Sequence, residues 1–165
     1  IVHDHHMPPL VIAGIGTESY REGVPIQPGA ETHVHEIRRL LRDYNGRVHI
    51  VGSVDEADIG GLYANAKAAI SATRSEGDLP GTAFEAIEAG VPFVCSNFPI
   101  FMEKLGEECA WIFEMGSAPM LGKRLTEAVY AGSEKTQAAA RKLASRNAIN
   151  VAQDYMNIFR RVSHA

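Results

Sequence analysis

The chain has 165 residues, of which 45% are hydrophobic and 22% charged, and its formal net charge is -4. These values are ordinary for a single soluble domain that is large enough to bury a core. The scattered Lys and Arg residues exclude the basic patch of a nucleic-acid-binding surface. No apolar run approaches the roughly 20 residues of a membrane-spanning helix.

The two cysteines, Cys95 and Cys109, fit neither a metal motif nor a disulfide framework. Unpaired cysteines are usual in reducing compartments, and the sequence shows no signal peptide, so we expect a cytoplasmic protein. Residues 1–8 hold a cluster of histidines. An N-terminal tail or a tag remnant explains this cluster more simply than a metal site, so we place one domain over residues 9–165.

Short apolar runs alternate with helical patterns along this domain. We predict strands at 10–13, 48–51, 68–71, 91–95 and 110–113. We predict helices at 31–44, 56–66, 82–89, 100–106, 118–131, 134–145 and 150–162. The alternation predicts an α/β fold, a Rossmann-like parallel sheet of about five strands with helices on both faces and right-handed crossovers. Arg38, Arg39 and Arg42 are predicted to form the solvated side of the first helix, and Trp111 is predicted to lie in the core.

The first strand ends at Gly14, and Gly16 follows in a long loop. The pair Gly14-x-Gly16 is weak evidence for a dinucleotide fingerprint, because the third glycine is replaced by Ser19. The second strand ends at Gly52 without a ribose-binding acid, which also disfavours a nicotinamide dehydrogenase.

The third strand leads through a polar loop into a helix that begins near Pro80-Gly81-Thr82. Thr82 can cap this helix, and Gly81 lets a ligand approach the backbone. The free N–H groups of a helix start suit an anion such as phosphate. Glu76 and Glu85 bracket this start, and carboxylates suit sugar hydroxyls. The stretch therefore predicts a nucleotide-sugar site at the carboxyl ends of the strands, where parallel sheets bind ligands.

The same residues have simpler interpretations. Glu85 could be only a first-turn acid that stabilises the helix dipole, and Glu76 could be a solvated loop residue. Arg74, in the same loop, could contact phosphate or simply lie on the surface. The residues taken singly leave these alternatives open.

An ordered series of short motifs resembles the C-terminal, donor-binding domain of a GT-B-fold retaining glycosyltransferase. The family is the large one that contains sucrose synthases and many mannosyl- and glucosyltransferases, and the match covers residues 9–162. The motifs are Leu10-Val-Ile-Ala-Gly14-x-Gly16-x-Glu18, Arg47-Val-His-Ile-Val-Gly52-x-Val54, Leu62-Tyr63-x-x-Ala66, Ser75-Glu76-Gly77, Leu79-Pro80, Glu85-Ala86, Ala89-Gly90-x-Pro92, and Ser96 with Glu103.

The resemblance implies a role for each matching residue. Glu76 corresponds to the family's donor-sugar ligand and Glu85 to its ribose ligand. Eight residues separate these two acids, one more than in the family's Glu-x7-Glu hallmark, so Asp78 or a neighbour is an insertion. Backbone N–H groups near Gly81 and Thr82 are implied to hold the diphosphate. The remaining implied contacts are the glycine loop at Gly14 and Gly16 and the backbone near Gly52 and Val54, which would contact the base.

The resemblance also implies what lies outside this chain. The family's phosphate-neutralising Arg and Lys, its acceptor-binding domain and its catalytic machinery should precede Ile1, so we assign no catalytic residue here. The expected function is sugar transfer from a UDP- or GDP-sugar to a hydroxyl acceptor, without a metal or other cofactor. We expect the isolated chain to be inactive, and any peripheral membrane contact to come only through the missing half.

Two alternatives use the same fold. One is half of a nucleotide-sugar 2-epimerase, whose catalytic acids and bases would come from the missing part. The other is a non-catalytic scaffold or binding module, in which Glu76 and Glu85 would be dispensable.

Overall fold

A computed structural model of the chain describes residues 6–14, 16–26, 28–44, 46–74 and 76–144, with Gln153 and Met156. The predicted helix at 150–162 lies outside these residues apart from those last two. The chain divides into two compact units, unit 1 (Ile1–Leu62) and unit 2 (Tyr63–Ala165). No helix within the described ranges is long and apolar enough to cross a bilayer.

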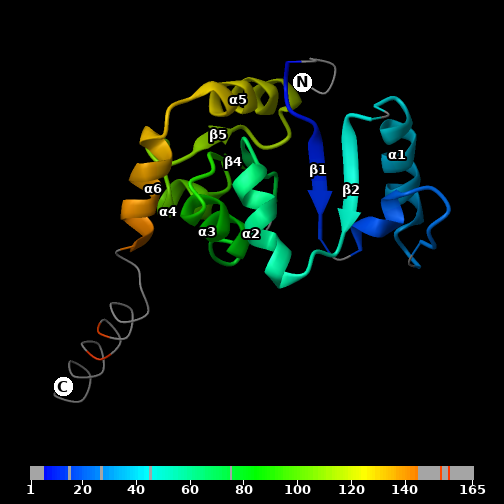
Figure 1. Cartoon of the computed structure of the whole chain (residues 1–165), viewed down its shortest axis with the longest axis horizontal. Helices are drawn as coiled ribbons and strands as arrows, with labels where there is room; N and C mark the ends of the chain where they lie inside the picture. Colours follow the sequence, from blue (N-terminus) through cyan, green and yellow to red (C-terminus); the bar gives the residue numbers. More distant parts are fainter. Residues whose placement is uncertain are drawn as a thin grey trace. The chain divides into compact units, whose positions relative to one another are not determined.

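Unit 1 contains two parallel strands, β1 (Leu10–Ala13) and β2 (Val48–Gly52), which run side by side (Figure 1). A short 3-10 helix, η1 (Thr17–Tyr20), and a long helix, α1 (Glu31–Arg42), connect them. The helix α2 (Glu56–Asn65) begins in unit 1 and ends in unit 2. Along β2, Val48 and Ile50 are half-buried whereas the alternate residues are exposed, as expected for a strand whose two faces differ in cover.

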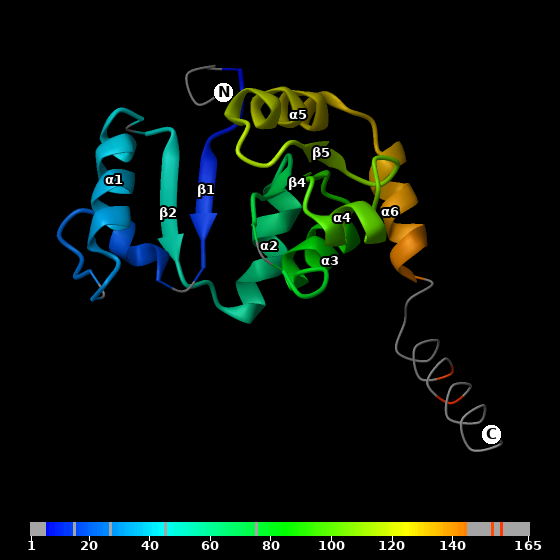
Figure 2. The same ribbon diagram turned by 180° about the vertical axis from the view of Figure 1, so that it is seen from behind.

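Unit 2 is built on three parallel strands in the order β3-β4-β5. Helices pack on both faces: α5 contacts β4 and β5, whereas α3 contacts β3 and β4 from the opposite side (Figures 1 and 2). The elements are β3 (Ala69–Ser71), α3 (Gly81–Glu88), β4 (Phe93–Ser96), α4 (Pro99–Lys104), β5 (Trp111–Phe113), α5 (Ala118–Tyr130) and α6 (Glu134–Ala144).

The core of unit 2 surrounds β4, whose four residues are all buried. A central parallel strand is covered on both faces, which explains why its first three residues are all apolar. Phe93 packs edge-on against Phe101 of α4, with ring centroids 5.9 Å apart. Cys95 belongs to the same cluster, and burial raises the pKa of its thiol to about 12, so it behaves as a small apolar residue. Trp111 is buried as predicted.

All five predicted strands are present, each parallel to its neighbours within its own sheet, and the α/β class is confirmed. The six described α-helices begin and end within two residues of their predicted limits. Within the described residues the strands form two hydrogen-bonded sheets, one in each unit. The helix η1 was expected to be loop. Its turn is closed by the hydroxyls of Thr17 and Ser19, which donate to the carbonyls of Gly14 and Gly16, both at 2.8 Å.

We predict that Phe101→Ala lowers the free energy of unfolding of unit 2 by about 3–5 kcal/mol, because it empties a fully buried site. Urea unfolding followed by the fluorescence of Trp111, the single tryptophan, measures this change. The neighbouring Met102→Ala, at a position 45% exposed, is the matched control and should cost less than about 1 kcal/mol. Equal losses in the two variants would contradict the assigned core.

Candidate functional site

The start of α3 presents unpaired backbone N–H groups. Pro80 is the N-cap residue, and no side chain caps the helix. The first turn is closed by the N–H of Ala83, which donates to the carbonyl oxygen of Pro80 at 2.9 Å. The N–H groups of Gly81 and Thr82 donate to none of the described residues. These two groups are therefore available to an anion.

The predicted capping role of Thr82 is wrong. Proline lacks an N–H and has a fixed φ, so a helix can start directly after Pro80, which is extended with φ -66° and ψ 152°. Thr82 then lies within the first turn rather than before it. The same early start leaves α3 without an acidic residue in its first turn, so Glu85 is not the first-turn acid that the simpler interpretation required.

Glu85 nevertheless lies beside the helix start. Side chains on a helix lean toward its N-terminus, so residue i+4 lies over residue i. The Oε1 atom of Glu85 is 3.7 Å from the point that a Cβ on Gly81 would occupy. Its other oxygen, Oε2, accepts a hydrogen bond of 3.1 Å from the hydroxyl of Tyr63. Burial, followed by this hydrogen bond, raises the pKa of Tyr63 to about 12. The structure thus brings Gly81, Thr82 and Glu85 together.

Glu76 is not fixed in the same way. It is half-buried and makes no hydrogen bond or ion pair with the part of the chain that the structure describes. Two residues later, the Oδ1 atom of Asp78 accepts a hydrogen bond of 2.8 Å from the N–H of Leu79. Leu79 is buried and anchors the loop to the core. The loop is therefore held at its helix end, and the sugar-binding role of Glu76 remains a prediction.

In unit 1, the carboxyl ends of β1 and β2 are joined by a short network. The N–H of Gly14 donates to the carbonyl oxygen of Gly52 at 2.8 Å. The N–H of Ser53 donates to the Oε1 atom of Glu18 at 2.7 Å. Backbone hydrogen bonds, including this one, lower the pKa of Glu18. The network holds the turn at Gly52. Gly16 lies in the segment that follows β1, and Val54 lies in the segment that follows β2.

Glu18 and Tyr63 are site-adjacent residues to which the sequence assigned no role. Glu18 is matched only as part of a motif, and Tyr63 fits the apolar face of a helix. Each acts on a residue far away along the chain, 35 and 22 positions respectively. No local spacing rule reveals contacts of that kind.

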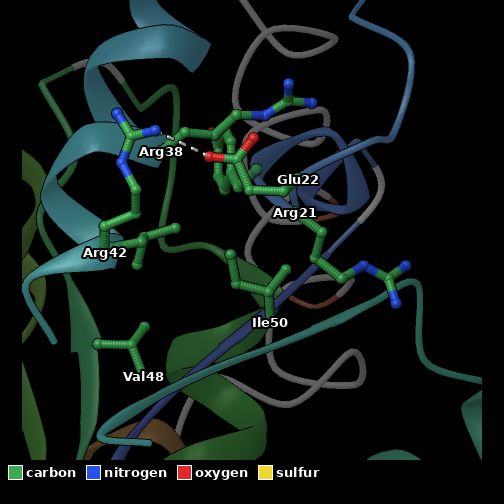
Figure 3. A pocket seen from close by; sticks show the side chains of 8 residues that line it. Arg21, Glu22, Arg38, Arg42, Val48 and Ile50 are labelled. Carbon is green, nitrogen blue, oxygen red and sulfur yellow. Dashed lines mark hydrogen bonds and ion pairs between the residues drawn. The ribbon is translucent and has the colours of Figure 1, made fainter. Parts of the chain in front are cut away.

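A cavity of about 330 Å³ lies in unit 1, and none of the predicted donor residues of that unit lines it. Val48 and Ile50 of β2 line one part of it, whereas Arg42 and Glu22 meet at another part of its wall (Figure 3). The remaining lining residues are Tyr20, Arg21, Arg38 and Leu41. Three arginines at one cavity raise the question of an anion site.

The contacts of these arginines argue against that assignment. Arg38 is half-buried, and its guanidinium donates to the carbonyl oxygen of Ser19 at 3.0 and 2.7 Å and to that of Val24 at 2.5 Å. Its predicted place on the solvated side is therefore wrong, because it holds the loop after η1. Arg42 pairs with Glu22 at 3.5 Å, and Arg21 extends away from Val48 and Ile50 (Figure 3).

A second cavity, of about 210 Å³, lies in unit 2 near the ends of β3 and β5. Its lining is mainly apolar and includes Phe113 and Leu121. Arg74 reaches its edge but remains exposed, which agrees with the surface interpretation. Within the described ranges, no group of His, Cys, Asp or Glu side chains could hold a metal ion.

Comparisons with known proteins place the chain in a family. A family model described as "Glycosyl transferases group 1" matches residues 4–144. Among solved structures, Anabaena Alr3699/HepE in complex with UDP matches with a TM-score of 0.64 and 16% identity over 95% of this chain. AviGT4, a glycosyltransferase involved in avilamycin A biosynthesis, matches with a TM-score of 0.61 and 21% identity over 95% of the chain.

A third structure is the UDP-forming α,α-trehalose-phosphate synthase from Burkholderia xenovorans in complex with glucose-6-phosphate, with a TM-score of 0.61 and 16% identity over 96% of the chain. At these identities the likeness shows the fold. The chain spans only part of each structure, 49% of the HepE chain and 44% of the other two. The comparison with curated proteins gives no match.

We predict that Gly52→Ala breaks the contact between Glu18 and Ser53. Gly52 has φ +80°, and a Cβ there would lie 2.7 Å from the Glu18 side chain. Gly46→Ala is the matched control, because Gly46 has φ +78° but open space around it. Both variants bear the backbone strain of about 1–2 kcal/mol. Only Gly52→Ala should accelerate hydrogen exchange at the Ser53 amide, by about tenfold.

Exchange measured by NMR separates the two effects. Unchanged Ser53 protection in Gly52→Ala, or an equal loss in both variants, would contradict the clamping role of Glu18.

Proposed function

Because the chain belongs to the glycosyl transferases group 1 family, we propose that it is the donor-binding half of a retaining glycosyltransferase. The ligand is a nucleoside diphosphate sugar. The observation that carries this proposal is the helix start in unit 2, where the free N–H groups of Gly81 and Thr82 lie beside the carboxylate of Glu85. N–H groups that can donate to an anion, next to a carboxylate that can accept from hydroxyls, match a diphosphate joined to a ribose.

The helix start would also assist the reaction. Breaking the bond between sugar and diphosphate leaves additional negative charge on the diphosphate. Preorganised N–H groups stabilise charge that develops at a leaving group, without reorganisation during the reaction. The proposed role of Gly81 and Thr82 is therefore to hold the diphosphate and to stabilise it as it leaves.

The two acids have separate roles in the proposal. An ionised carboxylate only accepts hydrogen bonds, and both ribose and donor sugar supply hydroxyl donors. Glu85, which Tyr63 holds in place, is assigned to the ribose. Glu76 is assigned to the donor sugar, on the strength of the family motif alone. In unit 1, the backbone near Gly52 and Val54 is assigned to the base, with Gly14 and Gly16 as the glycine loop.

The length of the chain, compared with the similar solved structures, supports the proposal that parts of the enzyme lie elsewhere. The chain spans about half of each similar structure, so we assign acceptor binding and the catalytic residues to a second half, and we expect this chain alone to be inactive. HepE is complexed with UDP and with UDP-glucose, which supports a UDP-sugar donor for this chain, with a GDP-sugar as the alternative. The buried, unpaired cysteines support a reducing, cytoplasmic location.

We predict that the chain binds UDP or GDP weakly and that Glu85→Gln reduces this affinity by about 10- to 100-fold. The reason is the loss of a charge-assisted hydrogen bond to the ribose, worth about 1.5–3 kcal/mol. Calorimetric titration measures the change. Glu88→Gln is the matched control, an exposed acid on the same helix that should leave affinity within about twofold.

Two outcomes would contradict the proposal. One is the absence of binding to either nucleotide, even by a longer chain that restores the upstream phosphate-binding residues. The other is binding that Glu85→Gln and Glu88→Gln weaken equally.

A further inference from the structure

We propose that Tyr63 is a positioning residue, which orients the carboxylate of Glu85 so that one of its oxygens faces the ribose hydroxyls of the donor. The inference rests on the proposed function, because it assigns Tyr63 a part in the ribose contact. It adds a residue to that contact which would itself touch neither sugar nor phosphate.

The geometry around the tyrosine hydroxyl is specific. Tyr63 lies in the last turn of α2 and belongs to unit 2. Its hydroxyl oxygen is 3.1 Å from Oε2 of Glu85 and 3.4 Å from the carbonyl oxygen of Thr82. The hydroxyl has a single proton, and the shorter contact to a charged acceptor is the stronger one. The Tyr63 hydroxyl therefore contacts both the Thr82 carbonyl group, in the first turn of α3, and the Glu85 carboxylate.

The tyrosine is itself held in place. Its ring packs against the buried core cluster of unit 2, which includes residues of α3 such as Ala83 and Ala86. A tyrosine has only two side-chain torsions, and here the ring end is fixed by packing. Glu85, in contrast, is exposed and has three torsions. Because the tyrosine ring is fixed by the core, the hydrogen bond restricts the side-chain torsions of Glu85, which would otherwise rotate freely.

The consequence for a ligand follows from the two oxygens. Tyr63 occupies Oε2, whereas Oε1 lies toward Gly81, at the end of the helix where the N–H groups are unpaired. A carboxylate oxygen that faces this end can accept from a hydroxyl of a ribose whose diphosphate is bound there. The high pKa of Tyr63, about 12, keeps its proton in place at neutral pH, so the tyrosine remains a donor.

The test is Tyr63→Phe, which keeps the packed ring and removes the hydroxyl. We expect UDP to bind Tyr63→Phe about three- to tenfold more weakly than it binds the unmodified chain. Binding of 2′,3′-dideoxy-UDP, which lacks the ribose hydroxyls, should change less than about twofold. The readout is the ratio of the dissociation constant for UDP to that for 2′,3′-dideoxy-UDP. General damage to the fold would weaken the binding of both ligands alike and leave this ratio unchanged.

Two further variants make the result specific. Tyr130→Phe removes a hydroxyl at a 64% exposed position of unit 2 and should leave the ratio unchanged. The double variant Tyr63→Phe/Glu85→Gln should bind UDP no more weakly than Glu85→Gln alone, because Tyr63 acts through Glu85. Trp111 fluorescence in urea checks that each variant is folded.

The outcomes separate this inference from the proposed function. Failure of the unmodified chain, and of its longer form, to bind UDP would overturn the proposed function. UDP binding with an unchanged ratio in Tyr63→Phe, or equal added losses in the double variant, would overturn the role of Tyr63 alone.

Discussion

The candidate site depends on the way in which α3 begins. Pro80 has no N–H to offer, and its fixed φ lets the helix start at the next residue without a capping side chain. The N–H groups of Gly81 and Thr82 are left without acceptors among the described residues. The helix behind them is fixed, because Ala83, Ala86 and Ile87 are buried. An exposed first turn on a well-packed helix is a rigid surface that suits the binding of an anion.

Packing against the core fixes the positions of the groups on this surface. The strand β4 is buried along its whole length and lies between α3 on one side and α5 on the other. Tyr63 packs against the same cluster and reaches Glu85 with its hydroxyl. The acid that the family pattern assigns to ribose is thus connected to the most buried part of unit 2. Glu76, which has no such connection to the described residues, is the less constrained of the two acids.

The fold could be predicted from local patterns, whereas half of the site could not. Apolar runs such as the first three residues of β4 locate strands because a buried parallel strand needs an unbroken apolar sequence. The same rule predicted a buried strand at Leu10–Ala13, which the structure confirms as a strand but shows with alternating half-buried and exposed residues. The predicted capping role of Thr82 was wrong because proline and threonine are both typical of helix starts, and here Pro80 occupies the N-cap position. Glu18, Tyr63 and Arg38 were missed or misplaced because their partners lie 14 to 35 residues away along the chain. Local sequence rules do not reach such distances.

The proposed function depends on the start of α3 binding the diphosphate of the donor. An amide correlation NMR spectrum of the ¹⁵N-labelled chain, recorded during titration with UDP, tests it most directly. The largest changes in chemical shift should occur at the amides of Gly81 and Thr82, because their N–H groups gain acceptors. Saturable changes confined to the arginine-lined cavity of unit 1, with Gly81 and Thr82 unmoved, would contradict it.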